Sequence, residues 1–120
     1  MDEKRFKELV EEALDLLPKE FAEKLNNVSV VVEDFPSPYQ IRKAKLTPYM
    51  LLFGLYEGVP QTKRGVYYSA IPDKITIFKN AIEQIAQTEE QIRAQVRQTV
   101  IHEIGHHFGL SDAQLRKAGK

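Results

Sequence analysis

The sequence predicts an α+β fold, and two observations lead to this class. Residues 2–17 and 88–108 repeat apolar side chains at intervals of three and four, which is the pattern of amphipathic helices. Residues 28–33, 50–56 and 74–78 are short apolar runs of strand length, and the first and last of them are rich in β-branched side chains. We therefore expect one small sheet with helices packed against it.

The first helix is expected to end at Pro18, because proline cannot continue a helix in its interior. Pro18 can also begin a second, short helix, whose inward residues would be Phe21, Ala22 and Leu25. Asn26-Asn27 would end that helix in a tight corner, directly before the first strand.

The middle of the chain alternates between polar connections and apolar runs. Residues 34–45 contain two prolines and three cations and are expected to form a surface connection. Residues 50–56 are nearly all apolar, which suits a strand buried on both faces, and Gly58 and Pro60 would stop it. A polar tip follows, and residues 66–68 are either a short strand or part of a loop.

The last third of the chain is expected to contain one strand and two helices. Pro72-Asp73 predicts a turn before the strand at residues 74–78. Asn80 is the expected cap of a short helix. Thr88 and Gln91 have the spacing of a capping box, which would open the long helix.

On a wheel of 100° per residue, the long helix has one apolar side. His102 and His106 lie away from the centre of that side, so they are expected to face outward, where a substrate can reach them. The apolar side is formed by Ile92, Val96, Val100, Ile101, Ile104 and Phe108.

Composition excludes several classes of function. Lys and Arg together number 17, as do Asp and Glu, so the net charge of zero does not favour nucleic acid or an anionic membrane as a partner. There is no cysteine, which excludes disulfides and cysteine metal sites. No apolar run reaches the length of a membrane span, and the charged N-terminus does not resemble a signal peptide. We expect a cytoplasmic protein with a single domain over residues 1–120.

All three histidines lie within six positions near the end of the chain. His102 and His106 are four residues apart, so on a helix they share one face and can bind one metal ion. Glu103 completes an H-E-x-x-H pattern, in which the glutamate acts as general base on a metal-bound water. His107 lies off this face and is interpreted as a bystander. The alternative is that the histidine pair occupies an ordinary solvated helix face.

A catalytic zinc site needs a third protein ligand and an open position. Gly109 follows three residues after His106 and can turn the chain back, because glycine tolerates a positive φ. The carboxylate of Asp112 could then close on the metal. Asp112 is alternatively the N-cap of a short helix, together with Ser111, and the two roles do not exclude each other.

The string H-E-x-x-H-x-x-G-x-x-D resembles the zincin metallopeptidases whose third ligand is aspartate. The chain as a whole is similar to the small bacterial family of minimal zincin-like metallopeptidases, on this string and on residues 51–60 and 72–78. The resemblance implies a zincin-like domain, with a short mixed sheet of three or four strands and a long active-site helix near the C-terminus. It also implies one metal ion, at His102, His106 and Asp112. Zinc is the expected metal, although other divalent metals suit the same donors.

These residues predict a zinc-dependent metallopeptidase that acts on peptides or unfolded proteins, with Glu103 passing a proton from water to the leaving amine. Residues 74–78 are the first candidate for an edge strand that holds the substrate, and residues 65–69 are the second. Tyr67 or Tyr68 could donate to the oxyanion, although ordinary packing is the simpler role for both.

Only eight residues follow Asp112, so the far wall of the cleft is expected to be missing or built from one short helix and the loop at residues 57–73. Two alternatives therefore stand beside the peptidase. One is a metal-binding module for peptides or proteins, with little or no turnover. The other is a latent peptidase that needs a partner.

Overall fold

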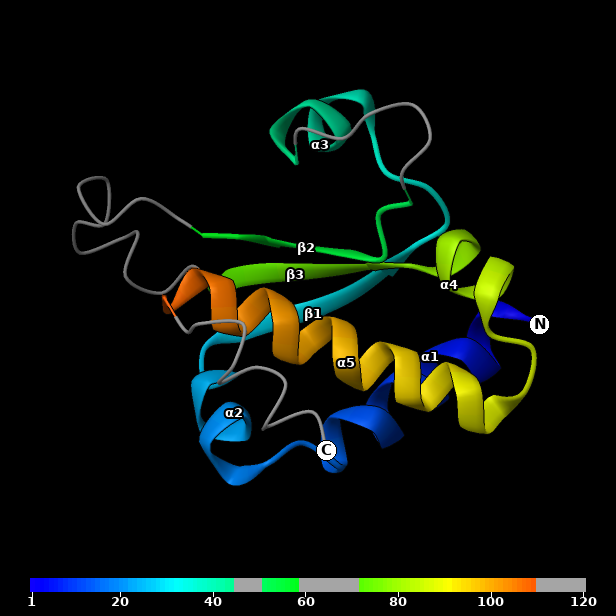
Figure 1. Cartoon of the computed structure of the whole chain (residues 1–120), viewed down its shortest axis with the longest axis horizontal. Coiled ribbons are helices and arrows are strands. Elements are labelled where there is room, and N and C mark those ends of the chain that lie inside the picture. The colour runs from blue at the N-terminus through cyan, green and yellow to red at the C-terminus, as the bar shows by residue number, and fades with distance from the viewer. Residues whose placement is uncertain (45–50, 59–71, 110–120) are drawn as a thin grey trace.

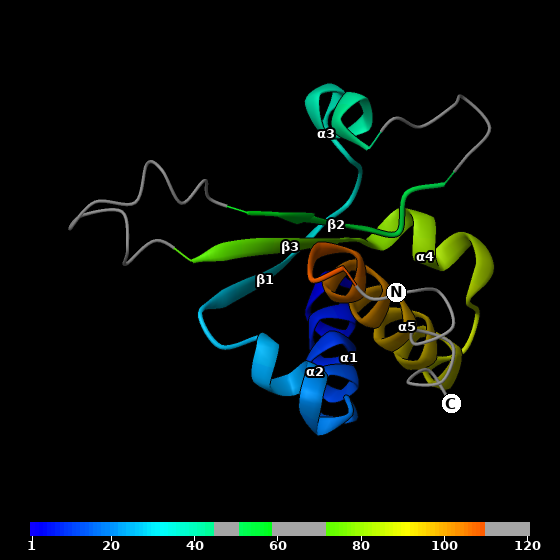
Figure 2. The same ribbon diagram turned by 60° about the vertical axis from the view of Figure 1, so that its left-hand side comes forward.

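The computed structural model describes residues 1–44, 51–58 and 72–109 of the chain. In these residues the chain forms one sheet of three strands, and Figures 1 and 2 show α1, α2 and α5 on one side of it and α3 on the other. This arrangement confirms the α+β class. The elements are α1 (Glu3–Asp15), α2 (Lys19–Lys24), β1 (Val28–Glu33), α3 (Pro38–Lys43), β2 (Gly54–Glu57), β3 (Asp73–Phe78), α4 (Lys79–Ile85) and α5 (Glu89–His107).

The sheet is mixed, as expected, but the strand at residues 74–78 is not at its edge, contrary to the expectation. β3 lies in the centre, parallel to β1 and antiparallel to β2. The strand at residues 74–78 therefore cannot be an open edge, because both of its sides already pair with neighbouring strands. It also begins one residue early, since Asp73 is paired with Val28 rather than placed in a turn.

β2 is shorter than the apolar run that predicted it. The strand begins at Gly54, and residues 51–53 precede it without regular structure. It lies at an edge of the sheet, and the expected burial of both faces holds for its first two residues only. Gly54 and Leu55 are buried, while Tyr56 and Glu57 are half-buried.

Side chains on β3 alternate between two cores. Ile75 and Ile77 point toward α1 and α5 and join the main core, whereas Phe78 packs with Leu55 on the opposite face of the sheet. The main core also contains buried residues of the flanking helices and of the segments directly after α1 and α4: Phe6, Leu9, Val10, Ala13, Leu17, Phe21, Ile82, Ala86, Ile92, Val96, Val100, Ile101 and Ile104.

The N-terminal helices follow their patterns with small differences. α1 is capped by Asp2, whose carboxylate accepts from the Arg5 N–H at 2.7 Å. α2 buries Phe21 but leaves Ala22 exposed, contrary to the expectation, because a six-residue helix covers the core with only one narrow stripe. Asn27 has φ of 61°, which confirms the tight corner before β1.

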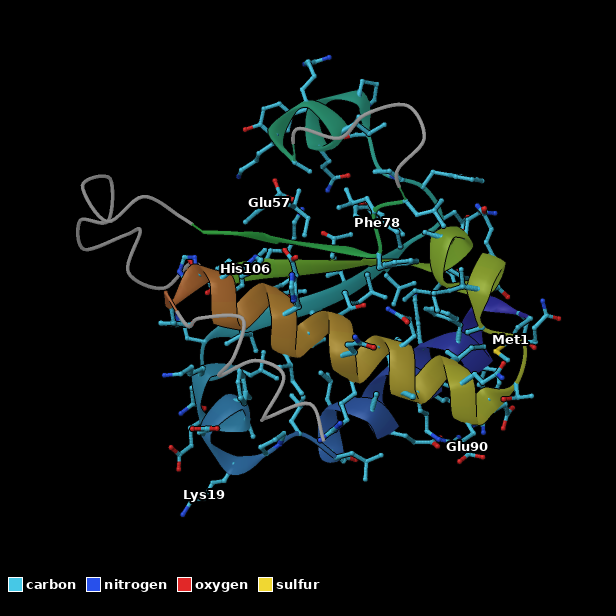
Figure 3. All side chains as sticks on the ribbon, viewed as in Figure 1. Met1, Lys19, Glu57, Phe78, Glu90 and His106 are labelled. Atoms are coloured by element: carbon cyan, nitrogen blue, oxygen red, sulfur yellow. The ribbon has the colours of Figure 1, made fainter. Side chains whose placement is uncertain are left out.

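Residues 34–45 were expected to be a connection, but they contain α3. Ser37 and Gln40 form a reciprocal capping box, and Pro38 occupies the first helical position. Gln40 is buried and donates to Glu57 Oε1 at 3.1 Å. Figure 3 labels Glu57 between the sheet and α3, so this bond helps to hold α3 over the sheet.

α4 begins directly after β3 and has no side-chain cap at its start. Asn80 does not cap it, contrary to the expectation, because the helix already begins at Lys79. The Asn80 side chain instead accepts from Gln84 Nε2 at 2.8 Å, one turn along the same helix.

α5 is a helix of 19 residues and opens with the predicted capping box of Thr88 and Gln91. The apolar side of the wheel is buried, as predicted, except that Phe108 is 47% exposed, because the helix ends at His107 and Phe108 caps it. No helix in the described part of the chain is long and apolar enough to cross a membrane.

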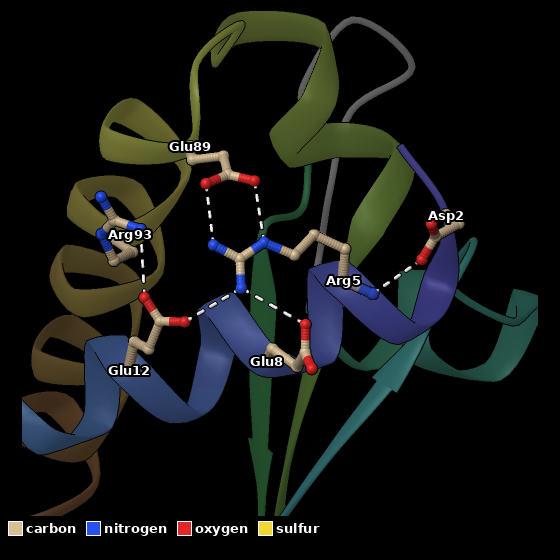
Figure 4. Close-up of polar contacts among 6 residues, drawn as sticks. All are labelled: Asp2, Arg5, Glu8, Glu12, Glu89 and Arg93. Carbon is tan, nitrogen blue, oxygen red and sulfur yellow. Dashed lines mark hydrogen bonds and ion pairs between the residues drawn. The ribbon is translucent and has the colours of Figure 1, made fainter.

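Arg5 links the start of α1 to the start of α5, as Figure 4 shows. Its guanidinium makes two bonds of 2.8 Å to the Glu89 carboxylate and one of 3.2 Å to Glu12. Glu12 also accepts from Arg93 at 3.1 Å. This network helps to set the position of α5 relative to α1, and α5 carries the residues of the H-E-x-x-H pattern.

Candidate active site

His102 and His106 lie on the outward side of the last two turns of α5. Both side chains are exposed, whereas Ile101, Ile104 and Gly105 of the same turns are buried. The two imidazole rings are 4.1 Å apart between centroids and tilted by 57°. Figure 3 labels His106 near the C-terminal end of the helix, beside the sheet. One side of α5 therefore packs against the core, and both imidazoles face solvent.

Two imidazoles at this separation suit one divalent metal, because both rings can turn a nitrogen toward a shared point. Within the described ranges, no group of three His, Cys, Asp or Glu side chains comes together to hold a metal. Asp112, the third ligand expected from the sequence, lies outside the described residues.

Gly109 ends α5 in the way that the sequence predicted. Its φ is +76°, in the left-handed region that favours glycine, and its N–H donates to the His106 carbonyl at 3.2 Å. The chain therefore turns at Gly109, where it leaves α5. A turn at this position is what a return of the chain toward the histidines requires.

Glu103 lies between α5 and the edge strand β2. It is half-buried, and its Oε1 accepts from the backbone N–H of Tyr56 at 3.0 Å. Burial raises the pKa of the Glu103 carboxyl above its usual range, against the opposing effects of the Tyr56 hydrogen bond and of His102 and His106. An oriented, half-buried carboxylate beside two imidazoles has the properties of a general base.

Tyr56 makes two further contacts in this region. Its ring stacks on His107, with 4.0 Å between centroids and 21° between planes. Its hydroxyl donates to Asp73 Oδ2 at 2.7 Å. A Cβ on Gly58 would lie 3.3 Å from His107 Cε1, so a glycine there leaves room for the ring. His107 lies off the ligand face, as expected, but its stacking on Tyr56 helps to join the end of α5 to β2.

Gly54 allows β2 and α5 to approach each other closely. A Cβ at this position would lie 2.7 Å from Thr99 Cγ2 and 3.1 Å from the Thr76 carbonyl oxygen. The absence of a side chain on Gly54 therefore brings the strand near enough to α5 for the Tyr56 N–H to reach Glu103. A glycine within a strand was the one sequence signal for this approach, because such glycines often mark close contact between backbones.

A cavity of about 310 Å³ opens beside His102 and Glu103. Residues 51–54 form one side of it and α5 forms the other. His102 and Glu103 lie among its lining residues, together with Gln95, Gln98 and Thr99. The cavity therefore continues from the proposed catalytic residues along α5 toward the N-terminus of that helix.

The profile of the zincin-like metallopeptidases matches residues 25–120, which is most of this chain and includes the whole H-E-x-x-H string. The chain belongs to the zincin-like metallopeptidase family. It is also similar to the solved structure of a conserved hypothetical protein from Thermus thermophilus, with 24% identity and a TM-score of 0.59. That similarity covers 90% of this chain and 94% of the other, and it concerns the fold. No curated protein matches the chain.

In this member of the family, the structure brings together His102, Glu103 and His106 from one helix and adds Tyr56 from the strand beside it. Two further expectations from the sequence lie outside the described residues. One is a strand at residues 65–69 that holds the substrate, and the other is an oxyanion donor at Tyr67 or Tyr68.

Proposed function

We propose that this protein is a zinc-dependent metallopeptidase in which His102, His106 and Asp112 hold the metal and Glu103 is the general base. One observation carries the proposal: two exposed imidazoles lie 4.1 Å apart on the helix turns that also carry a half-buried, hydrogen-bonded glutamate. Membership of the zincin-like metallopeptidase family supports the same assignment.

The donors suit zinc, because two imidazoles and one carboxylate are the kind of set that leaves a coordination position open. Zinc bound by such donors supplies a Lewis acid that lowers the pKa of water and polarises a carbonyl group.

Glu103 performs the proton transfers. The Tyr56 N–H donates to Oε1 at 3.0 Å, so we propose that the second oxygen, Oε2, accepts the proton from water. Glu103 takes a proton from the attacking water and delivers it to the nitrogen of the leaving amine, which balances the hydrolysis of a peptide bond. Because the carboxylate is anchored to a strand, it is already oriented before the substrate arrives.

β2 replaces the strand at residues 74–78 as the strand that binds substrate. Phe78 N donates to the Phe53 carbonyl at 2.9 Å, and Leu55 is paired with Thr76. In an antiparallel pair the backbone groups alternate in direction, so those of Gly54 and Tyr56 point toward the outer edge. The Tyr56 N–H serves Glu103, and Gly54 is therefore the residue whose backbone meets an extended peptide.

The test is a zinc measurement and a peptide-library digest on untagged protein, with and without chelator. Wild type is expected to bind one zinc ion and to cleave peptides. Glu103→Gln keeps the shape of the side chain but cannot accept a proton. It should retain zinc and lose activity by about 10²–10⁴-fold. His102→Ala and His106→Ala should both lose stoichiometric zinc.

A matched control is Glu90→Gln, the same exchange on an exposed glutamate in the first turn of α5. Figure 3 labels Glu90 and His106 at opposite ends of that helix. Glu90→Gln should change neither zinc content nor turnover. Zinc-loaded wild type that cleaves no peptide would favour the alternative of a metal-binding interaction module. Equal cleavage by wild type and Glu103→Gln would refute the role of Glu103.

A further inference from the structure

We propose that β1 is the contact surface between two copies of this chain, which pair their β1 strands antiparallel about a two-fold axis and so form one continuous sheet. Such an interface uses the same surface on both copies. The inference does not depend on the proposed peptidase function, because β1 and β2 are opposite edges of the sheet, as Figure 1 shows, and it is β2 that adjoins Glu103.

Within the residues that the structure describes, β1 has a neighbouring strand on one side only. The Asp34 carbonyl, directly after β1, accepts from the Asn80 N–H at 3.1 Å and continues the parallel register of β1 and β3. Because backbone groups alternate in direction along a strand, the even-numbered residues of β1 point toward β3, as Asp34 does. The N–H and C=O groups of Ser29, Val31 and Glu33 therefore point outward, away from β3.

The composition of β1 does not protect this edge. Val28–Glu33 contains no proline and no lysine, and four of its six residues are valine. Its first five residues are half-buried. Edge strands of monomeric proteins usually carry charges, prolines or bulges, because an unprotected edge pairs with other chains. The composition of β1 therefore suits a strand that pairs with a second strand.

An antiparallel pairing centred on Val31 uses all three outward residues. Val31 then faces the partner's Val31, and on either side of the axis Ser29 faces the partner's Glu33. Each of these facing pairs exchanges two backbone hydrogen bonds. The side chains are compatible, because valine packs on valine and the serine hydroxyl can donate to the carboxylate. A parallel pairing in register would instead place the two Glu33 carboxylates side by side.

A groove of about 300 Å³ between α1 and β1 can receive side chains of the second copy. Val10 and Leu14 of α1 line it, together with residues 30–32 of β1. Val30 and Val32 lie on the groove side of the sheet, where they pack against the main core. Opposed residues of an antiparallel pair point to the same face, so the partner's Val30 and the partner's Val32 also lie on this side. Their removal from water would stabilise the dimer.

Two opposite charges border the same groove and favour a second copy as its occupant. Lys7 and Glu11 lie one turn apart on α1, and both are exposed and line the groove. A two-fold rotation reverses their order, so Lys7 comes toward the partner's Glu11, and Glu11 toward the partner's Lys7. The Lys7 ammonium also lies 3.4 Å from the Glu3 carboxylate, in an exposed pair of the kind that is weak enough to exchange. The groove is therefore complementary in charge to itself.

Sedimentation equilibrium of the untagged full chain over a range of concentrations measures the dissociation constant of the dimer. Wild type is expected to be a reversible dimer. Val31→Lys places two ammonium groups opposite each other across the axis and should raise the dissociation constant at least about 100-fold, because facing like charges repel strongly in an interface. A lysine at an outward position of an edge strand is compatible with a folded monomer. The control is Ile85→Lys, at an exposed apolar side chain on α4, which should stay dimeric.

Lys7→Glu and Glu11→Lys test the charge pairing, and exposed positions such as these tolerate the exchange without loss of the fold. Each single variant should weaken the dimer by about 3- to 10-fold at low salt. A mixture of the two variants should form a heterodimer with at least wild-type affinity, because the two changes together restore opposite charges at both contacts. The double variant should recover wild-type affinity for the same reason.

Amide hydrogen exchange followed by NMR identifies what covers the edge. In the wild-type dimer, the outward N–H groups of Ser29, Val31 and Glu33 should be protected. In monomeric Val31→Lys, those of Ser29 and Glu33 should exchange at least about tenfold faster, whereas the inward N–H groups of Val30 and Val32 should stay protected.

Three results would overturn the proposal. The first is a wild-type protein that stays monomeric up to about 1 mM with its outward amides protected, because another part of the same chain would then cover the edge. The second is a monomer whose outward amides exchange rapidly, which would leave the edge open to a different partner. The third is a dimer that is unaffected by Val31→Lys and by the charge exchanges, because its interface would then lie elsewhere.

Discussion

Gly54→Ala tests the claim that the close approach of β2 and α5 depends on a missing side chain. The added Cβ would lie 2.7 Å from Thr99 Cγ2, about 0.7 Å short of the 3.4 Å at which ordinary contacts begin. It would also lie 3.1 Å from the Thr76 carbonyl oxygen, which belongs to the central strand. Neither neighbour is the end of a long flexible side chain, so strand and helix must separate.

Two effects oppose each other in this variant. Added volume in a packed region typically costs about 1–3 kcal/mol. Gly54 does not have a positive φ, so alanine fits the backbone and should restrict the unfolded chain, which stabilises by about 0.4–1 kcal/mol. We expect the overlap to dominate, with a net loss of roughly 1–2 kcal/mol in the free energy of unfolding. The midpoint of thermal unfolding should fall by roughly 3–6 °C for each kcal/mol.

Thr99→Ser provides the matched rescue. It removes the Cγ2 that meets the new methyl group and keeps the hydroxyl that accepts from Gln95. In a double-mutant cycle measured by urea unfolding, the double variant should recover about 1 kcal/mol relative to the sum of the single variants. Recovery should be partial, because the contact with the Thr76 carbonyl remains. Gly58→Ala, whose nearest contact is 3.3 Å to the His107 ring, should cost less than Gly54→Ala. The reasoning would be refuted if Gly54→Ala were as stable as wild type, or if the double-mutant cycle showed no coupling between Gly54→Ala and Thr99→Ser.

Two further predictions concern the metal and the link between α1 and α5. Asp112→Ala should weaken zinc binding by at least about 10- to 100-fold in a competition assay with a chelator; unchanged affinity with a stability loss of about 1 kcal/mol would make Asp112 a helix cap instead. Arg5 lowers the pKa of the Glu89 carboxyl, so this pair stabilises the fold above the usual pKa of 4.5, and that contribution is lost as pH falls through the lower pKa of the folded state. In urea unfolding at low salt, Arg5→Gln should therefore be less stable than wild type at neutral pH. The difference in stability should shrink below about pH 4.5 and at high salt. A difference that does not depend on pH would contradict the ionic role of Arg5.

Features that depend on a few neighbouring residues could be predicted from the sequence. The capping box of Thr88 and Gln91 and the turns at Asn27 and Gly109 are examples, because caps and positive φ values are local chemistry. The outward side of α5 was also predictable, since helix geometry alone determines which residues share a face. The same kind of local signal was present at Ser37 and Gln40, but the two prolines and three cations around them suggested a connection rather than α3.

Strand order could not be predicted in this way. An isolated apolar run does not indicate which neighbours its strand will have. β3 lies in the centre because it pairs with both β1 and β2, and its pairing with β1 joins segments that are distant in the sequence. Among the described residues, β2 is therefore an edge strand and residues 74–78 are not.

The sequence by itself determined the composition of the candidate site: two histidines one helical turn apart, a glutamate beside the first of them, and a glycine that ends the helix. Only the tertiary structure decided what surrounds these residues. Tyr56 lies 47 positions from Glu103 in the chain, and the two meet because Gly54 lets an edge strand approach α5. The cavity has the same origin, since its walls come from residues 51–54 and from α5. The physical reason is that helix spacing is a property of one segment, whereas anchoring a base and shaping a cavity require two segments to pack together.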